Sequence, residues 1–462
     1  MTVEIKPRNI ETIEQVKTLV RHRGLTHVKV GLTDIDGVIR GKYMSKAKFF
    51  SALDKGFAFC DVVLGWDSND QLYENSGTEY TGWQTGYPDA AVRIVPESCR
   101  ELHDEPGMLF FLVEFKDDAE SLCPRGVLRR MLNKAEQLGL EAFAAFEYEF
   151  FLFNETPDSV REKNYQNLQP ITPGFFGYSV LRNTVHAEMY QDFIQLCETM
   201  DFPLEGLHTE TGPGVLEAAI TVDEAGRAAD KAILFKTFVK AWAQRRDMMA
   251  TFMAKWSNDF PGQSGHIHLS LRHKSDGSSA FFDPSAEQGM SAIQRQFLAG
   301  QQKFMPELCA MYSQTVNAYS RMVPGFWAPT DATWGVENRT TALRVITGSE
   351  ASQRIEFRLG AADANPYIAL AAALGSGLEG IEQGLAPEPQ VTGNAYEQRF
   401  PNHLALPQTL DVAAYALQHS SVAKSLFGEN FVKHYAATRQ WESREFRKHV
   451  TDWELQRYFE II

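Results

Sequence analysis

Three short stretches of the sequence carry ionisable side chains two residues apart, which places them on one face of a β-strand. They are Glu147 with Glu149, His266 with His268, and Arg354 with Glu356 and Arg358. Taken singly, such a pair is more often a solvated strand face than a binding site. Phe-Phe-Leu-Phe follows Glu149, however, and a strand this apolar is expected to be buried. Adjacent buried carboxylates need a compensating cation, and carboxylates with an occasional imidazole suit Mg²⁺ or Mn²⁺ rather than structural zinc.

The nearest candidate for a phosphate-binding loop fails on inspection. Residues 37–42 read GVIRGK, which is one residue short of a P-loop, and Tyr43 stands where the motif needs Ser or Thr. We interpret this segment as a turn followed by a basic strand. Any nucleotide site is therefore expected to depend on metal ions and arginines.

The elements that must position these side chains follow residue 118. Strands are predicted over residues 142–153, 205–220, 266–271 and 354–359, and long helices over 223–248 and 365–380. Because strands and helices do not alternate strictly, the pattern predicts an α+β domain with an antiparallel sheet. Its most aliphatic stretch, residues 367–378, is short and contains glycines, so we expect a buried helix there.

The chain before residue 118 is predicted to form a small α/β unit of its own. A helix is expected over residues 12–23, a strand with alternating apolar residues follows, and a turn is expected at Asp36-Gly37. Another strand is expected over residues 108–115, before a polar stretch and a helix that begins at Pro124. We place the boundary in the polar stretch, giving domains 1–118 and 119–462.

Composition excludes several classes of protein. Lys and Arg total 45 against 59 Asp and Glu in 462 residues, for a net charge of −14. This charge argues against binding to nucleic acid or to an anionic membrane. No apolar run approaches the ~20 residues that span a bilayer. The first residues do not read as a signal peptide, and the five cysteines form no CxxC pair, so we expect a cytoplasmic protein with reduced thiols.

Five motifs, in order along nearly the whole chain, resemble those of the glutamine synthetase family. They are residues 146–153 (FEYEFFLF), His208-Thr209-Glu210 with Glu217, Lys255 with residues 261–270 (PGQSGHIHLS), residues 321–325 (RMVPG) with Asn338, Arg339 and Arg344, and residues 354–358 (RIEFR) with 365–367. The resemblance implies a small N-terminal β-grasp domain and a larger catalytic domain whose sheet forms a concave, metal-binding face. It also implies a homo-oligomer, a dodecamer of two hexameric rings, with each active site between one catalytic domain and a neighbour's N-terminal domain.

The resemblance also implies a role for each matching residue. Two to three Mg²⁺ or Mn²⁺ ions are expected per site, held by two sets of ligands: Glu149, Glu210 and Glu217 beside glutamate, and Glu147, His266 and Glu356 beside the ATP phosphates. ATP contacts are expected from Glu205, His268 and Ser270. Glutamate is expected to contact Gly262, Arg321 and Arg358. The transferring phosphoryl group is expected to face Arg339, Arg344 and Arg354, the first two of which would also contact ATP. Arginine suits this task because it stays charged and pairs with phosphate in a planar fork.

Departures from the family pattern cluster where ammonia would bind. The family's Asp-Gly-Ser-Ser is Asp61-Val62-Val63-Leu64 here, Phe175 stands where a tyrosine is expected, and Trp327 replaces the glutamate of a mobile flap. We interpret these changes as an amine pocket that has become apolar, with Asp61 as the remaining candidate base. The predicted activity is ATP-dependent coupling of the glutamate side-chain carboxylate to an apolar or aromatic primary amine, as in the γ-glutamylamide-forming branch of the family. An apolar lining disfavours polyamines.

Three other interpretations remain open at this point. The chain could be an ordinary glutamine synthetase that uses ammonia, a non-catalytic structural or regulatory oligomer, or an enzyme that has lost its activity by drift. The complete metal-ligand set favours a working enzyme over the last two. Tyr396 lies near a position where some relatives carry a regulatory tyrosine, although an ordinary surface tyrosine is the more common reading.

Overall fold

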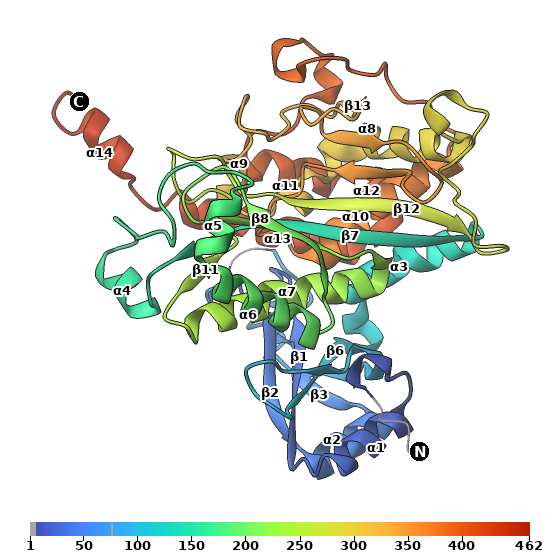
Figure 1. The fold of residues 1–462 in the computed structure, drawn as a ribbon, viewed down its shortest axis with the longest axis vertical. Helices are drawn as coiled ribbons and strands as arrows, with labels where there is room; N and C mark the ends of the chain where they lie inside the picture. Colours follow the sequence, from blue (N-terminus) through green and yellow to red (C-terminus); the bar gives the residue numbers. More distant parts are fainter. Residues whose placement is uncertain (1–5, 75–76) are drawn as a thin grey trace.

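The computed structural model describes residues 6–74 and 77–462, and it contains two β-sheets (Figure 1). The first part of the chain, drawn in blue, forms a sheet with the strand order β2-β1-β6-β4-β3, and β5 pairs with β6. Strands β1 and β6 run parallel, and the other pairs are antiparallel. The elements are α1 (Ile13–His22), β1 (His27–Thr33), β2 (Ile39–Ser45), α2 (Lys46–Lys55), β3 (Phe57–Cys60), β4 (Asp89–Ile94), β5 (Arg100–Glu101) and β6 (Leu109–Phe115).

The turn expected at Asp36-Gly37 connects β1 to β2. Gly37 has a φ of +86°, and its N–H donates to the carbonyl of Asp34 at 3.2 Å. A side chain would be strained at this φ, which explains the glycine. Residues 37–42 therefore form a turn and the start of a strand, as predicted, and not a phosphate loop.

The larger sheet has the strand order β13-β14-β15-β12-β7-β9-β8, and β10 and β11 pair with opposite ends of β7. All of its pairings are antiparallel except that between β13 and β14. The strands are β7 (Leu140–Phe153), β8 (Leu204–Thr209), β9 (Val215–Ile220), β10 (Asp223–Glu224), β11 (Met249–Thr251), β12 (Gly265–His273), β13 (Trp334–Val336), β14 (Leu343–Ile346) and β15 (Arg354–Phe357). The predicted strands over residues 142–153 and 266–271 correspond to β7 and β12.

Two predicted elements differ from the structure. The single strand predicted over residues 205–220 is the hairpin β8–β9, because Gly212 and Gly214 both adopt positive φ and reverse the chain. At Gly214 a Cβ atom would lie 2.6 Å from the Leu152 carbonyl oxygen, so the turn also packs too closely for a side chain. The helix predicted over residues 223–248 is shorter, because its first two residues pair with β7 as β10 and its last residues form the turn that leads into β11.

Helices surround the larger sheet, and α3 and α7 contact β7 directly (Figure 1). The buried helix expected over residues 367–378 is α10, which packs against α8 so closely that a Cβ at Gly300 would lie 2.1 Å from the Ser376 carbonyl oxygen. The helices are α3 (Pro124–Gln137), α4 (Pro157–Glu162), α5 (Val180–Val185), α6 (Ala187–Thr199), α7 (Ala225–Gln244), α8 (Ala292–Tyr312), α9 (Val316–Tyr319), α10 (Pro366–Glu382), α11 (Leu410–His419), α12 (Ser421–Phe427), α13 (Glu429–Phe446) and α14 (Asp452–Tyr458). Short 3₁₀ helices are η1 (Pro7–Asn9), η2 (Asp61–Leu64), η3 (Pro96–Ser98), η4 (Asp117–Ser121), η5 (Glu287–Gly289), η6 (Ala395–Glu397) and η7 (Asn402–Leu404).

None of the helices formed by residues 6–74 and 77–462 combines the length and the apolar character that crossing a membrane requires.

Candidate active site

The polar side chains predicted to do chemistry converge on one face of the larger sheet. Antiparallel register places His266 opposite Glu147, His268 opposite Glu356, and Glu217 opposite Glu149. These residues open into a cavity of about 420 Å³, which we call the catalytic cavity. It is lined by Glu147, Glu149, Tyr178, Glu210, Thr211, Val215, Glu217, residues 261–264, His266, His268, Phe326, Trp327, Arg339, Arg344, Glu356 and Arg358.

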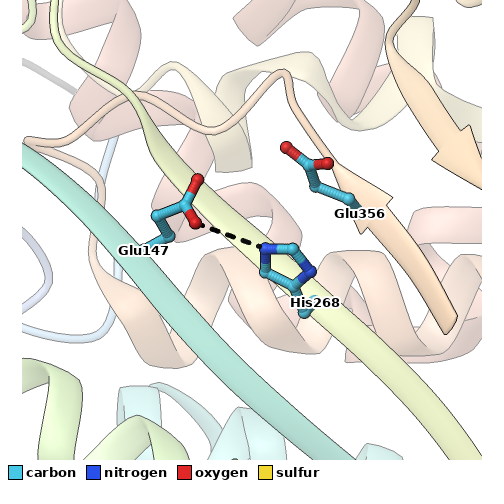
Figure 2. Close-up of side chains that lie close together, drawn as sticks. All are labelled: Glu147, His268 and Glu356. Carbon is cyan, nitrogen blue, oxygen red and sulfur yellow. Dashed lines mark ion pairs between the residues drawn. The ribbon is translucent and has the colours of Figure 1, made fainter. Parts of the chain in front are cut away.

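One cluster of potential metal ligands consists of Glu147, His268 and Glu356, which come from β7, β12 and β15 (Figure 2). Their ligand atoms all lie within 4.8 Å of one another, and His268 Nε2 is 3.8 Å from a Glu147 carboxylate oxygen. His266 Nδ1 lies 3.1 Å from Glu147 and 3.5 Å from Glu356, while its Nε2 is buried without a hydrogen-bond partner among the described residues. Either imidazole could therefore complete this set, whereas the sequence favoured His266.

Charge in this cluster is balanced by cationic neighbours. Burial alone would raise the pKa of Glu147, but hydrogen bonds from the two histidines hold it well below its usual value. Burial also opposes ionisation of Glu356, yet Arg358 and the histidines lower its pKa to about 2. Burial, then the charge of Arg358, lowers the pKa of His266 to about 4. A neutral imidazole between ionised carboxylates is the form that binds a metal ion.

A second cluster consists of His208, Glu210 and Glu217, whose ligand atoms also lie within 4.8 Å of one another. Glu149 lies beside it, because it is paired with Glu217 across β7 and β9. Burial raises the pKa of Glu149 to about 7, and burial plus the surrounding carboxylates raises that of Glu217. Protein groups therefore leave this end of the cavity short of positive charge. Divalent cations such as Mg²⁺ or Mn²⁺ fit such a donor set of carboxylates and imidazoles.

The predicted arginines divide into two layers. Arg339, Arg344 and Arg358 line the cavity, and Arg344 Nη1 lies 2.8 Å from Glu356. Arg358 also pairs with Glu356. Behind them, Arg321 is buried and donates to the Ser264 hydroxyl at 3.0 Å and to the Leu359 carbonyl at 2.9 Å. Arg354 Nε lies 3.2 Å from His268 Nδ1. Arg321 and Arg354 are thus placed to support the cavity wall.

Glycine is required at position 262 by close packing. A Cβ there would lie 2.5 Å from the Ala254 carbonyl oxygen and 2.6 Å from Arg321 Cγ. The backbone at Gly262 therefore reaches the cavity directly, as a substrate-binding role requires. Two predicted ATP contacts, Glu205 on β8 and Ser270 on β12, do not line this cavity.

Asp61 does not reach the cavity of its own chain. It begins η2 and is buried, and the Thr81 hydroxyl donates to its carboxylate at 2.9 Å. Burial raises the pKa of this carboxyl. Val63 and Leu64, which stand in the family's ammonia-binding motif, lie in the hydrophobic core of this chain, because η2 turns both side chains inward.

Phe175, which we expect at the amine pocket, does not line the catalytic cavity within this chain. It packs against Phe260, with ring centroids 5.5 Å apart. Tyr178 does line the cavity, and its ring stacks on His208 at 4.4 Å and 13°. Tyr178 has a φ of +56°, an unusual conformation for an aromatic residue. No sequence signal identified Tyr178, because it follows a loop with glycines at 174 and 177 that has no regular period, and the sequence placed His208 in a motif without a ligand role.

Residues 323–328 form what we call the lid loop. Trp327, about half exposed, and Phe326 both face the catalytic cavity, so the predicted tryptophan does lie at the site. Tyr396 is less exposed than a surface tyrosine: its hydroxyl is enclosed and has no hydrogen-bond partner among the described residues.

The larger sheet carries two clusters of acidic and imidazole side chains beside arginines, and such a set of groups suits divalent cations and phosphate. The sequence matches the family described as "Glutamine synthetase, catalytic domain" over residues 121–458. The chain therefore belongs to the glutamine synthetase family, and it is an ATP-dependent carbon–nitrogen ligase.

Several characterised relatives and solved structures are similar to the chain. It is 41% identical to type-1 glutamine synthetase 2 of Dictyostelium discoideum, over 94% of this chain and 84% of that protein. It is 35% identical to glutamate–isopropylamine ligase of a Pseudomonas species, over 98% of this chain and 99% of that protein. It is 36% identical to γ-glutamylethanolamide synthetase GlnA4 of Streptomyces coelicolor, over 97% of this chain and 96% of that protein. Among solved structures, apo GmaS has the same fold, with a TM-score of 0.83 over 96% of this chain and 99% of GmaS, at 24% identity.

Proposed function

We propose that this chain uses ATP to phosphorylate the side-chain carboxylate of glutamate and then couples it to an apolar or aromatic primary amine. The observation that carries the proposal is the lining of the catalytic cavity. Acidic and imidazole ligands and three arginines line it, and so do Phe326 and Trp327. The first set suits phosphoryl transfer and the second suits a hydrocarbon body.

The cavity offers a role for each group in the first step. A glutamate carboxylate oxygen attacks the γ-phosphorus of ATP, and the bond to the leaving ADP oxygen breaks. Arg339 and Arg344 line the cavity where they can stabilise charge on the transferring group. Bound at the two acidic clusters, two to three Mg²⁺ or Mn²⁺ ions would neutralise phosphate charge. We assign one set to Glu149, Glu210 and Glu217, joined by His208, and the other to Glu147 and Glu356 with His266 or His268.

In the second step the amine nitrogen attacks the acyl carbon, inorganic phosphate leaves, and the nitrogen loses a proton. Trp327 carries no group that could accept this proton or bind ammonium by charge. An ammonium ion beside an indole would lose hydration without gaining equivalent hydrogen bonds. An alkyl or aryl amine would instead gain ~0.8 kcal/mol for each buried methylene.

Asp61 remains the candidate base, and we propose that it acts on the cavity of an adjacent copy. Its raised pKa brings it closer to that of an effective base at neutral pH. An active site shared between copies requires an oligomer, which we propose to be the dodecamer of two six-membered rings, with an N-terminal β-grasp domain (residues 1–118) facing a neighbour's catalytic domain (119–462). Mixing inactive Asp61→Asn with inactive Arg339→Ala subunits should restore activity, whereas no recovery would place Asp61 outside the site.

Ordinary glutamine synthesis is the second candidate function. The 41% identity to a Dictyostelium protein named as a glutamine synthetase favours it. The names of the amine ligases at 35% and 36% identity favour the first proposal.

The test is a panel of amines incubated with glutamate, ATP and Mg²⁺. Ammonia, isopropylamine, ethanolamine, putrescine and aniline would be supplied separately, with ADP release followed and products identified by mass spectrometry. We expect a γ-glutamylamide of an apolar amine as the best product. Glutamine as the best product would establish the second function, and no amide from any amine would overturn both.

A further inference from the structure

The lid loop is held at its ends and open in its middle. Residues on both sides of the opening, Met322 and Ala328, are buried. Between them Val323, Phe326 and Trp327 are all more than a third exposed. Gly325 and Trp327 adopt φ values of +83° and +60°, so the loop makes a tight double turn that presents two aromatic rings to the cavity. Such a short loop needs a specific contact to hold its middle in one position.

Lys255 supplies a contact of this kind. Its ammonium nitrogen lies 4.8 Å from the centroid of the Phe326 ring and donates to the Phe260 carbonyl at 2.6 Å. Lys255 is only 7% exposed, and no carboxylate forms an ion pair with it among residues 6–74 and 77–462. The Asn317 side chain holds the backbone of Lys255 in place. The Lys255 N–H donates to the Asn317 side-chain oxygen, and the Lys255 carbonyl accepts from the Asn317 side-chain nitrogen, both at 2.7 Å.

A buried ammonium without an anion depends on the groups that cover it. Burial lowers the pKa of Lys255, so its charged form gains from any favourable contact. The face of an aromatic ring is such a contact, and it is stronger where water is excluded. Phe326 is the ring in that position, and it belongs to the lid loop. Closing the loop over Lys255 therefore favours both partners, and opening it exposes the ammonium.

We propose that Lys255 is a positioning residue that latches the lid loop through Phe326, so that Trp327 stays closed over the reacting groups and excludes water. This inference rests on the proposed function, because the acyl phosphate is the species that water would destroy. Water attack on its acyl carbon expels inorganic phosphate and regenerates glutamate, with one proton released. ATP is then consumed without an amide being formed.

The experiment measures ADP and amide in the same reaction, using the full-length enzyme and its best amine. Wild-type enzyme should release about one ADP for each amide. Lys255→Met keeps the volume of the stem and removes the charge, and we expect the ratio of uncoupled to coupled turnover to rise about fivefold, the scale of one partly exposed cation–π contact. Lys255→Arg should restore coupling, and Phe326→Leu should uncouple like Lys255→Met.

Lys303→Met provides a matched control. Lys303 is exposed on α8, and its ammonium lies 5.1 Å from the Phe304 ring, outside the residues that line the catalytic cavity. We expect its coupling ratio to equal that of the wild type. The latch is overturned if soluble Lys255→Met and Phe326→Leu remain as coupled as the wild type, or if Lys255→Met changes only the KM for glutamate. Failure of the proposed function would look different, because wild-type enzyme would then form no amide.

Discussion

The strand residues that form the floor of the catalytic cavity and the residues of the lid loop are held in position in different ways. Glu147, His266 and Glu356 lie on adjacent paired strands, so hydrogen-bonded register fixes their relative positions. Phe326 and Trp327 lie on a short exposed loop, and the contact described for its middle is the ring of Phe326 over Lys255. The floor carries the charges and the lid carries the aromatic surface.

The largest effect is expected from removing divalent metal. Glu149 and Glu217 are partly buried with raised pKa values, so the second cluster has too little positive charge of its own to bind phosphates. Excess EDTA should abolish ligase activity, and added Mg²⁺ or Mn²⁺ should restore it. Full activity in excess EDTA would show that the reaction does not need divalent metal ions.

Substitutions among the charged residues of the cavity floor should have the next largest effect. We expect them to lower kcat by ~10²–10³ or more. Arg339→Ala is expected to do this with little loss of stability, because no ion pair to Arg339 occurs within the described part of the chain. Glu356 is buried and pairs with Arg344 and Arg358, so Glu356→Gln, which keeps a hydrogen-bond acceptor, is a safer substitution than Glu356→Ala, which would leave Arg358 without its acceptor. Kinetics and thermal unfolding of each variant provide the check, and near-normal kcat in both would disprove the assigned roles.

The lid should affect selectivity more than rate. Trp327→Glu places a carboxylate at the acceptor side of the cavity and should narrow the preference for an apolar amine over ammonia by about tenfold. Because Trp327 is half exposed, the fold should tolerate the change. Trp327→Phe serves as the matched control, with the preference retained. If Trp327→Glu leaves the preference for an apolar amine over ammonia unchanged, Trp327 does not determine which acceptor is used.

The smallest effect is expected at the boundary between floor and lid. Tyr178→Ala removes the ring that stacks on His208, and we expect kcat/KM to fall about fivefold, since an aromatic pair contributes ~1 kcal/mol. Tyr178→Phe keeps the ring and should stay within about twofold. If the two variants lose activity equally, the hydroxyl near Glu210 matters more than the stack.

The sequence predicts the strand residues of the site better than its loop residues. The alternation of Glu147 with Glu149 and of His266 with His268 identified one face of two strands, because the period of a strand is fixed by backbone geometry. Loop residues have no such period, so the sequence does not show that Tyr178 lines the cavity while Phe175 packs against Phe260. It also does not show that the 3₁₀ turn buries Val63 and Leu64. The hairpin at residues 204–220 was missed because its turn depends on two glycine conformations.

A competition between acceptors tests the central claim most directly. Wild-type enzyme would receive glutamate, ATP, Mg²⁺ and equal concentrations of ammonia and one apolar primary amine, and the two products would be counted by mass spectrometry from the same vessel. Their ratio gives the relative kcat/KM without any assumption about concentration of active enzyme. The account predicts at least a tenfold excess of the γ-glutamylamide over glutamine, or ~1.4 kcal/mol of discrimination. An excess of glutamine with every amine tried would contradict it.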